Sequence, residues 1–118
     1  MTDLETTLWN GPDQGPVFLF AHGAGAPMDS PFMERVARAL GEHGVRVGRF
    51  EFPYMVARRE SGKRRPPNPA KVLLQSWREQ VAAVGPAASV WIGGKSMGGR
   101  MATMVAVSYT HLRAHETS

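Results

Sequence analysis

Hydrophobic runs along the chain predict three strands, each followed by a helix. Residues 16–21 (PVFLFA) form a short continuous apolar run, which is typical of a strand buried on both faces of a parallel sheet. Apolar positions also indicate a second strand over residues 45–52, where their alternation is imperfect, and a third over residues 88–92. A further antiparallel strand is expected at residues 4–9.

Apolar positions at helical spacing follow each of the three strands. The first helix is expected from Pro31 to Gly44, because Ser30 is a capping residue and proline suits the first helical turn. The second is expected over residues 69–84 and the third over residues 97–106. Such an alternation implies parallel strands joined by right-handed crossovers, so the expected fold class is α/β.

Length and composition limit the chain to one small globular domain. It has 118 residues, of which 42% are hydrophobic and 20% are charged, as in folded rather than disordered chains. No apolar run approaches the ~18 residues of a membrane span, and residues 1–6 lack the apolar stretch of a secretory signal. The absence of cysteine excludes disulfides, thiolate metal ligands and a cysteine nucleophile. A cytoplasmic protein without membrane attachment is expected.

The net charge of +4 comes from one segment. Residues 57–66 carry five basic side chains and one acidic side chain, so the rest of the chain sums to zero. The basic, proline-rich stretch from Ala57 to Pro67 is expected to be a loop, which is either simply solvated or a lip that recognises anions. Nucleic-acid binding is not expected, because no aromatic side chain is interleaved with these charges and no reading motif accompanies them.

Residues 94–98 (GKSMG) form a G-x-S-x-G motif between a predicted strand and a predicted helix. In that context the motif is typical of a sharp turn that lifts a serine hydroxyl above the edge of the sheet. The flanking glycines let strand and helix approach, and the helix N-terminus favours negative charge that develops beside Ser96. An ordinary glycine-rich turn is the alternative. The motif makes Ser96 a candidate nucleophile.

A second motif, residues 21–26 (AHGAGA), directly follows the first buried strand. Loops at the carboxyl ends of parallel strands meet at one edge of the sheet, so this loop is expected to face Ser96. Hydrolases of this architecture hold a tetrahedral oxyanion with two backbone N–H groups, which here would come from Ala24 and Met97. A capped turn is the alternative for this motif. Candidate binding residues in the same loop are His22, Gly23 and Gly25.

Residues 16–106 resemble the N-terminal part of an α/β-hydrolase. The similarity rests on AHGAGAPMDSPFM (21–33), RFEFPYM (49–55), RRPP (64–67) and GGKSMGGRMA (93–102). These segments are most similar to the dienelactone-hydrolase-like branch, which includes the testis-expressed and histone-acetyltransferase-complex-associated hydrolase-like proteins. The resemblance implies a three-layer fold with helices on both faces of a mostly parallel sheet, in which the first buried strand lies between the other two.

The resemblance also implies an enzyme that cleaves an ester, thioester or similar acyl bond through an acyl-enzyme on Ser96. Ala24 and Met97 would form its oxyanion hole. The implied partner is a small-molecule acyl substrate, with no cofactor, metal or membrane, and no protein partner can be predicted. A catalytically silent hydrolase-like scaffold is the alternative. A P-loop would need a glycine five residues before Gly94, where the chain has Ser89.

The acid and the histidine of a hydrolase triad follow the serine in the chain. Residues 107–118 (VSYTHLRAHETS) have no apolar stripe and no strand alternation, and they resemble translated sequencing-adapter read-through. A non-native tail is therefore expected after hydrolase residues 1–106, which would be the front part of a longer protein. The chain is expected to be inactive, with the strand over residues 88–93 at an open edge of the sheet.

The histidines offer no believable general base. His22 belongs to the oxyanion loop and His43 to a helix end. In the tail, His115 precedes Glu116, which is the wrong order for a triad. His111 and His115 have the spacing of a metal-binding helix but lack the glutamate of H-E-x-x-H, so no metal site is expected.

Two further residues have alternative interpretations. Lys95 precedes the candidate nucleophile, and it either biases the site toward anionic substrates or simply faces solvent. Tyr54 follows the second strand, and it either lines the acyl pocket or packs in the interior.

Overall fold

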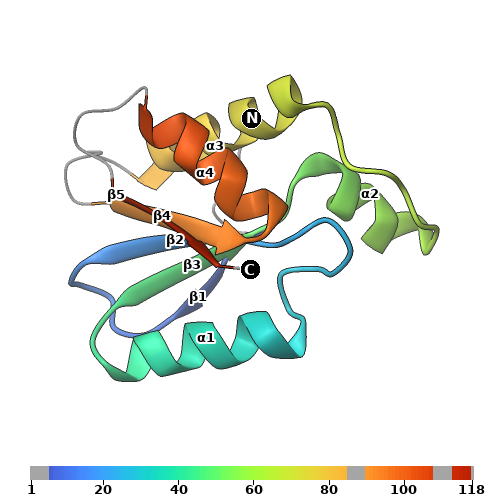
Figure 1. Ribbon diagram of the computed structural model, residues 1–118. Coiled ribbons are helices and arrows are strands. Elements are labelled where there is room, and N and C mark those ends of the chain that lie inside the picture. Colours follow the sequence, from blue (N-terminus) through green and yellow to red (C-terminus); the bar gives the residue numbers. More distant parts are fainter. Residues whose placement is uncertain (1–5, 85–89, 108–112, 118) are drawn as a thin grey trace.

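The computed structural model describes residues 6–84, 90–107 and 113–117. The strands are β1 (Leu8–Asn10), β2 (Val17–Ala21), β3 (Arg46–Phe50), β4 (Val90–Lys95) and β5 (Arg113–Thr117). The helices are α1 (Pro31–Glu42), α2 (Pro53–Ser61), α3 (Ala70–Val84) and α4 (Met97–Val107). The strands form one sheet in the order β1-β3-β2-β4-β5 (Figure 1). β1 runs antiparallel to β3, and all other neighbouring strands are parallel.

The first buried strand lies between the second and third, as predicted. Val17 of β2 is opposite Arg46 of β3 on one side and opposite Val90 of β4 on the other. The predicted antiparallel strand near the N-terminus is also confirmed, although it covers β1 rather than residues 4–9. The predicted end of the second helix and the predicted start of the third strand fall on residues 85–89, which lie outside the described residues.

Helices cover both faces of the sheet. α1 lies on one face, and α3 and α4 lie together on the other (Figure 1). Successive residues of β2 point into separate cores: Phe20 packs with Met33 of α1, whereas Leu19 lies in the cluster that contains Trp77 of α3 and Val105 of α4. The three-layer α/β fold is therefore confirmed. None of the helices in the described part of the chain has both the length and the apolar character that a membrane crossing requires.

The start of α1 follows its capping signal. The Met33 N–H donates to Ser30 Oγ at 3.4 Å, and Pro31 occupies the first turn, where a missing N–H leaves no acceptor unpaired. Met33 is buried against the sheet. The cap therefore fixes the first turn of α1 beside the carboxyl end of β2.

The basic segment is not a loop over its whole length, because α2 occupies its first part. Pro53 lies in the first turn of α2, and Gly62 ends the helix in the left-handed conformation with a φ of 74°. Tyr54 and Met55 are buried and anchor the helix to the core. The prediction of a loop was wrong for residues 57–61, because these two end signals and the buried pair outweigh the polar character of the segment.

The edge of the sheet beside β4 is covered by β5. The two strands are parallel, with Trp91 opposite Arg113 and Lys95 opposite Thr117. The predictions of an open edge at the third strand and of a tail without a strand are therefore wrong. The reason is that the unpaired N–H and C=O groups of an edge strand bind any extended backbone, whatever the side-chain alternation of the added segment.

Candidate active site

Ser96 lies in a tight turn between β4 and α4. Its φ is 52°, and it is the one residue other than glycine with a positive φ in the described ranges. Non-glycine residues held in the left-handed region are strained, and such strain is concentrated at functional sites. The turn leads directly into α4, where the Arg100 N–H donates to the Ser96 carbonyl oxygen at 3.0 Å. The side chain of Ser96 is only half-buried.

Glycines on either side of Ser96 allow α4 to begin against the end of β2. A Cβ on Gly94 would lie 2.8 Å from the Ala21 carbonyl oxygen and 2.7 Å from the Gly98 carbonyl carbon. A Cβ on Gly98 would overlap the His22 carbonyl oxygen. The Trp77 indole N–H donates to the Gly98 carbonyl oxygen at 3.3 Å and secures the first turn of α4. Any larger residue at these glycines would push the serine turn away from β2.

The loop after β2 lies directly beside the Ser96 turn. A Cβ on Gly23 would lie 3.2 Å from the Lys95 carbonyl oxygen and 3.8 Å from Ser96 Cβ. The two segments, about seventy residues apart in the sequence, border one cavity of about 480 Å³. It is lined by Gly23, Ala24, Gly25, Ala26, Ser30, Met33, Lys95 and Ser96. The structure therefore brings the two sequence motifs together around one space.

Two other sequence-predicted residues lie on either side of Ser96 in the chain. Met97 is buried, and because it is the first residue of α4, its backbone N–H lies in the first helical turn, next to Ser96. Lys95 is half-buried, and its Nζ lies 4.9 Å from the ring centroid of Phe32 in α1. The lysine therefore crosses from the serine turn to the first turn of α1.

The buried side chain of His22 holds the start of the loop by two hydrogen bonds. It is fully buried, with Nδ1 at 2.6 Å from the Gly23 carbonyl oxygen and Nε2 at 3.1 Å from the Phe52 backbone nitrogen. The Phe52 N–H donates, so Nε2 is the acceptor and Nδ1 carries the proton. Burial lowers the pKa of His22, which keeps the ring neutral. Because both ring nitrogens are occupied, His22 is unavailable as a base for Ser96.

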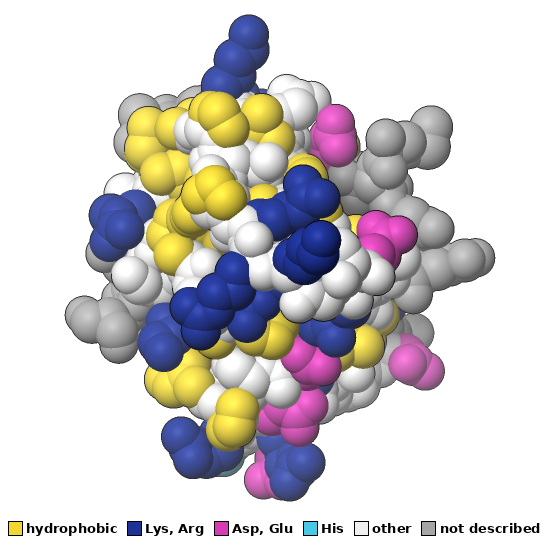
Figure 2. All heavy atoms as spheres, turned by 90° about the vertical axis from the view of Figure 1, so that its right-hand side faces the viewer, with side chains coloured by type: hydrophobic (Ala, Val, Ile, Leu, Met, Phe, Trp, Pro, Cys, Tyr) yellow, Lys and Arg dark blue, Asp and Glu magenta, His cyan; other side chains and the backbone are white. Residues whose placement is uncertain are grey.

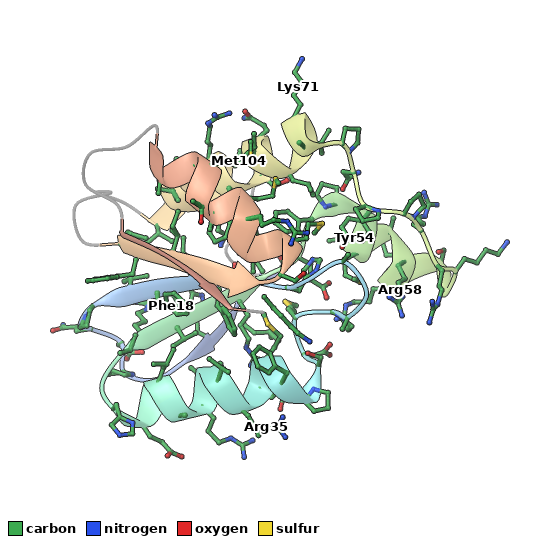
Figure 3. All side chains as sticks on the ribbon, in the orientation of Figure 1. Phe18, Arg35, Tyr54, Arg58, Lys71 and Met104 are labelled. Atoms are coloured by element: carbon green, nitrogen blue, oxygen red, sulfur yellow. The ribbon has the colours of Figure 1, made fainter. Side chains whose placement is uncertain are left out.

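Side chains of α2 bind the carbonyl groups of the same loop (Figure 3). The Tyr54 hydroxyl donates to the carbonyl oxygens of Gly23 and Ala24, at 3.2 and 3.0 Å. Arg58 Nη1 donates to the Gly25 carbonyl oxygen at 3.1 Å. Burial raises the pKa of Tyr54 to about 12, so the hydroxyl remains a donor. Tyr54 lies outside the lining of the cavity beside Ser96, and its place in an acyl pocket stays a prediction.

Arg59 fixes the far end of the loop with two carboxylates. Its Nη2 lies 2.6 Å from Glu51 Oε2 and 3.0 Å from Asp29 Oδ1, and it lowers the pKa of the Asp29 carboxyl. Glu51 Oε2 also accepts a hydrogen bond from the Met28 N–H at 3.2 Å. The roles of Arg58 and Arg59 were not predicted from the sequence. Both residues lie in the last turn of α2, which begins just after β3, at the edge of the sheet where the site lies. Recognising this helix in the sequence would have placed both arginines near the site.

Lys and Arg side chains gather on the face of the molecule over α2 and the segment that follows it (Figure 2). Lys63, Arg64 and Arg65 are exposed there. The basic segment therefore has two parts: two arginines in α2 that hold the loop, and a solvated group beyond Gly62.

The pH dependence of stability provides a test of the neutral, buried state of His22. Its pKa lies below the ordinary value of 6.5, so the unfolded chain binds this proton more readily than the folded chain. Stability is therefore lost as the pH falls through 6.5. We expect His22→Gln to lose less stability than the wild type between about pH 7.5 and pH 5, measured by urea unfolding. Parallel pH profiles for the two proteins would contradict this assignment.

Comparison with known proteins identifies the family. A family model described as an alpha/beta hydrolase domain matches residues 14–116. The chain belongs to the α/β-hydrolase family. The match includes both the Ser96 turn and the loop after β2. No curated protein is significantly similar to this α/β-hydrolase chain.

Solved structures similar in fold to this α/β-hydrolase include the "Thioesterase Domain From Curacin Biosynthetic Pathway", with a TM-score of 0.62 and 19% sequence identity over 89% of the present chain. The present chain spans 37% of the length of that structure. At this identity the similarity supports the fold and not the substrate.

Proposed function

We propose that Ser96 is the nucleophile of a serine hydrolase that cleaves an ester, thioester or similar acyl bond. The observation that carries this proposal is the left-handed Ser96 at a tight strand–helix turn that borders a cavity. In the proposed reaction Ser96 Oγ attacks the acyl carbon, and the alcohol or thiol leaves with a proton. Water then releases the acid from the acyl-enzyme. We also retain the dienelactone-hydrolase-like branch as a proposal.

The oxyanion of the tetrahedral intermediate is proposed to bind the N–H groups of Ala24 and Met97. The Gly23 carbonyl oxygen faces Tyr54 and the His22 ring, behind the loop. In a planar trans peptide the N–H points opposite to the carbonyl, so the Ala24 N–H is directed away from these groups. The Met97 N–H lies in the first turn of α4, where N–H groups have no intrahelical acceptor. Together they support an oxyanion hole beside Ser96.

We propose that neither His22 nor His43 is the general base for Ser96, and that the base and its acid are other residues. His22 uses both ring nitrogens in the loop, and His43 Nδ1 lies 2.8 Å from the Ala39 carbonyl oxygen at the end of α1. We also propose that the 118-residue chain lacks turnover. The boundary after Ala106 and the non-native origin of residues 107–118 stay predictions.

Chemical rescue tests this proposal. The 118-residue chain should hydrolyse p-nitrophenyl acetate no faster than its Ser96→Ala variant, because neither His22 nor His43 is placed to remove the serine proton. Added imidazole is expected to replace the base and raise the rate at least about tenfold above that of Ser96→Ala at the same imidazole concentration, in proportion to its neutral form. The Ser96→Ala protein measures the direct reaction of imidazole with the ester. Equal rates for both proteins at every imidazole concentration would contradict the proposal.

A further inference from the structure

Lys95 is the one charged side chain among the described residues that line the Ser96 cavity. We propose that the acyl compound bound there carries a carboxylate, and that the Lys95 ammonium group receives it. This inference rests on the proposed function of Ser96, and it adds the class of substrate: half-esters or half-thioesters of short dicarboxylic acids.

The position of the ammonium group is restrained. Lys95 is adjacent to Ser96 in the turn, and its Nζ lies over the Phe32 ring, 4.9 Å from the centroid. A cation over an aromatic face is attracted to the ring, so this contact keeps the charge at the wall formed by α1. The charge therefore lies on the side of the cavity that α1 forms.

Among the side chains that the structure describes, no carboxylate neutralises this charge. Lys95 takes part in none of the ion pairs between these side chains, whereas Asp29 and Glu51 are both paired with Arg59. Ser30, the capping residue of α1, also lines the cavity, so the positive end of that helix adds to the lysine. The potential in the cavity is therefore positive next to the proposed nucleophile.

The size and the charge of the cavity favour a small monoanion. Its volume of about 480 Å³ suits a small molecule. One lysine balances one negative charge, whereas a phosphate dianion is usually held by several donors or by a bidentate arginine. During the proposed reaction the carboxylate stays bound and unchanged, while the ester or thioester bond at the other end of the molecule breaks.

Binding of two matched esters tests the inference without catalysis. Monomethyl succinate carries one carboxylate and dimethyl succinate carries none. Added to the 118-residue chain, the monoester should shift the amide NMR signals of Ala24, Gly25 and Ser96 in a saturable way. We expect the diester to bind at least about tenfold more weakly, as for the loss of one charge-assisted contact.

Lysine variants locate the effect. Lys95→Met should weaken binding of the monoester at least about tenfold, and Lys95→Arg should retain the preference because it keeps the charge. Lys71→Met is the matched control, because Lys71 projects from α3 away from the rest of the molecule (Figure 3) and should leave binding unchanged. Unchanged amide signals far from the cavity verify that each variant is folded.

Several outcomes would overturn the inference. They are equal binding of the two esters, no binding of either ester, no effect of Lys95→Met, or tighter binding of methyl phosphate than of monomethyl succinate. The binding assay does not use the reactivity of Ser96, so failure of the proposed nucleophile is detected separately, by covalent labelling of Ser96 with diisopropyl fluorophosphate. If Ser96 is labelled but the monoester is not preferred, the proposed substrate class is refuted and the proposed nucleophile is not.

Discussion

Replacing Gly98 by alanine is expected to lower the free energy of unfolding by about 3 kcal/mol, at the upper end of the usual cost of overpacking. The added Cβ would overlap the His22 carbonyl oxygen and lie 3.0 Å from the Ala21 Cβ and carbonyl oxygen. All these atoms belong to β2 or to the residue after it. They cannot move without disturbing the pairing of the central strand or the two hydrogen bonds of the His22 ring. Urea unfolding followed by circular dichroism measures the change.

Gly25→Ala is the matched control for Gly98→Ala. Gly25 lies in the loop on the other side of the cavity, and a Cβ there would meet no heavy atom within 4 Å. Its stability should therefore stay within about 0.5 kcal/mol of the wild type. If Gly98→Ala were as stable as Gly25→Ala, the close packing of the serine turn against β2 would be refuted.

The central part of the fold could be predicted because its signals are local and strong. The continuous apolar run of β2 indicates a strand covered on both faces, and Ser30-Pro31 marks the start of α1. β5 could not be predicted in this way, because its pairing depends on the free backbone of β4 and not on alternation in its own side chains. α2 was missed because Gly62 was not recognised as a helix end within a polar segment.

The site could be predicted where a motif fixes backbone geometry. Both the serine turn and the loop after β2 are glycine-rich, and the parallel sheet places them at the same edge. The hydrogen bonds from Tyr54 and Arg58 could not be predicted, since they depend on how α2 docks behind the loop. The place of His22 in the loop could be predicted, but the two hydrogen-bond partners that hold its ring could not.

Ser96 is expected to react with diisopropyl fluorophosphate about a hundredfold faster than Ser30 in the 118-residue chain, the usual effect of an oxyanion-type donor. The serine oxygen attacks phosphorus, fluoride leaves, and the serine proton passes to water. Both serines line the same cavity, so access is matched. They differ because Ser30 Oγ accepts the Met33 N–H as a helix cap, whereas Ser96 lies beside the proposed oxyanion hole. Without a general base this attack is slow, but the adduct is not hydrolysed, so it accumulates and can be observed without turnover.

Peptide mass spectrometry over a time course of this labelling tests the role of Ser96 most directly. The account predicts an adduct that accumulates on Ser96 toward one per chain while Ser30 stays unmodified. In urea the two serines should react at the same slow rate, because the turn and the loop no longer hold the N–H groups in place. Equal labelling of Ser96 and Ser30 in the folded protein, or labelling of other serines before Ser96, would contradict the assignment of Ser96 as nucleophile.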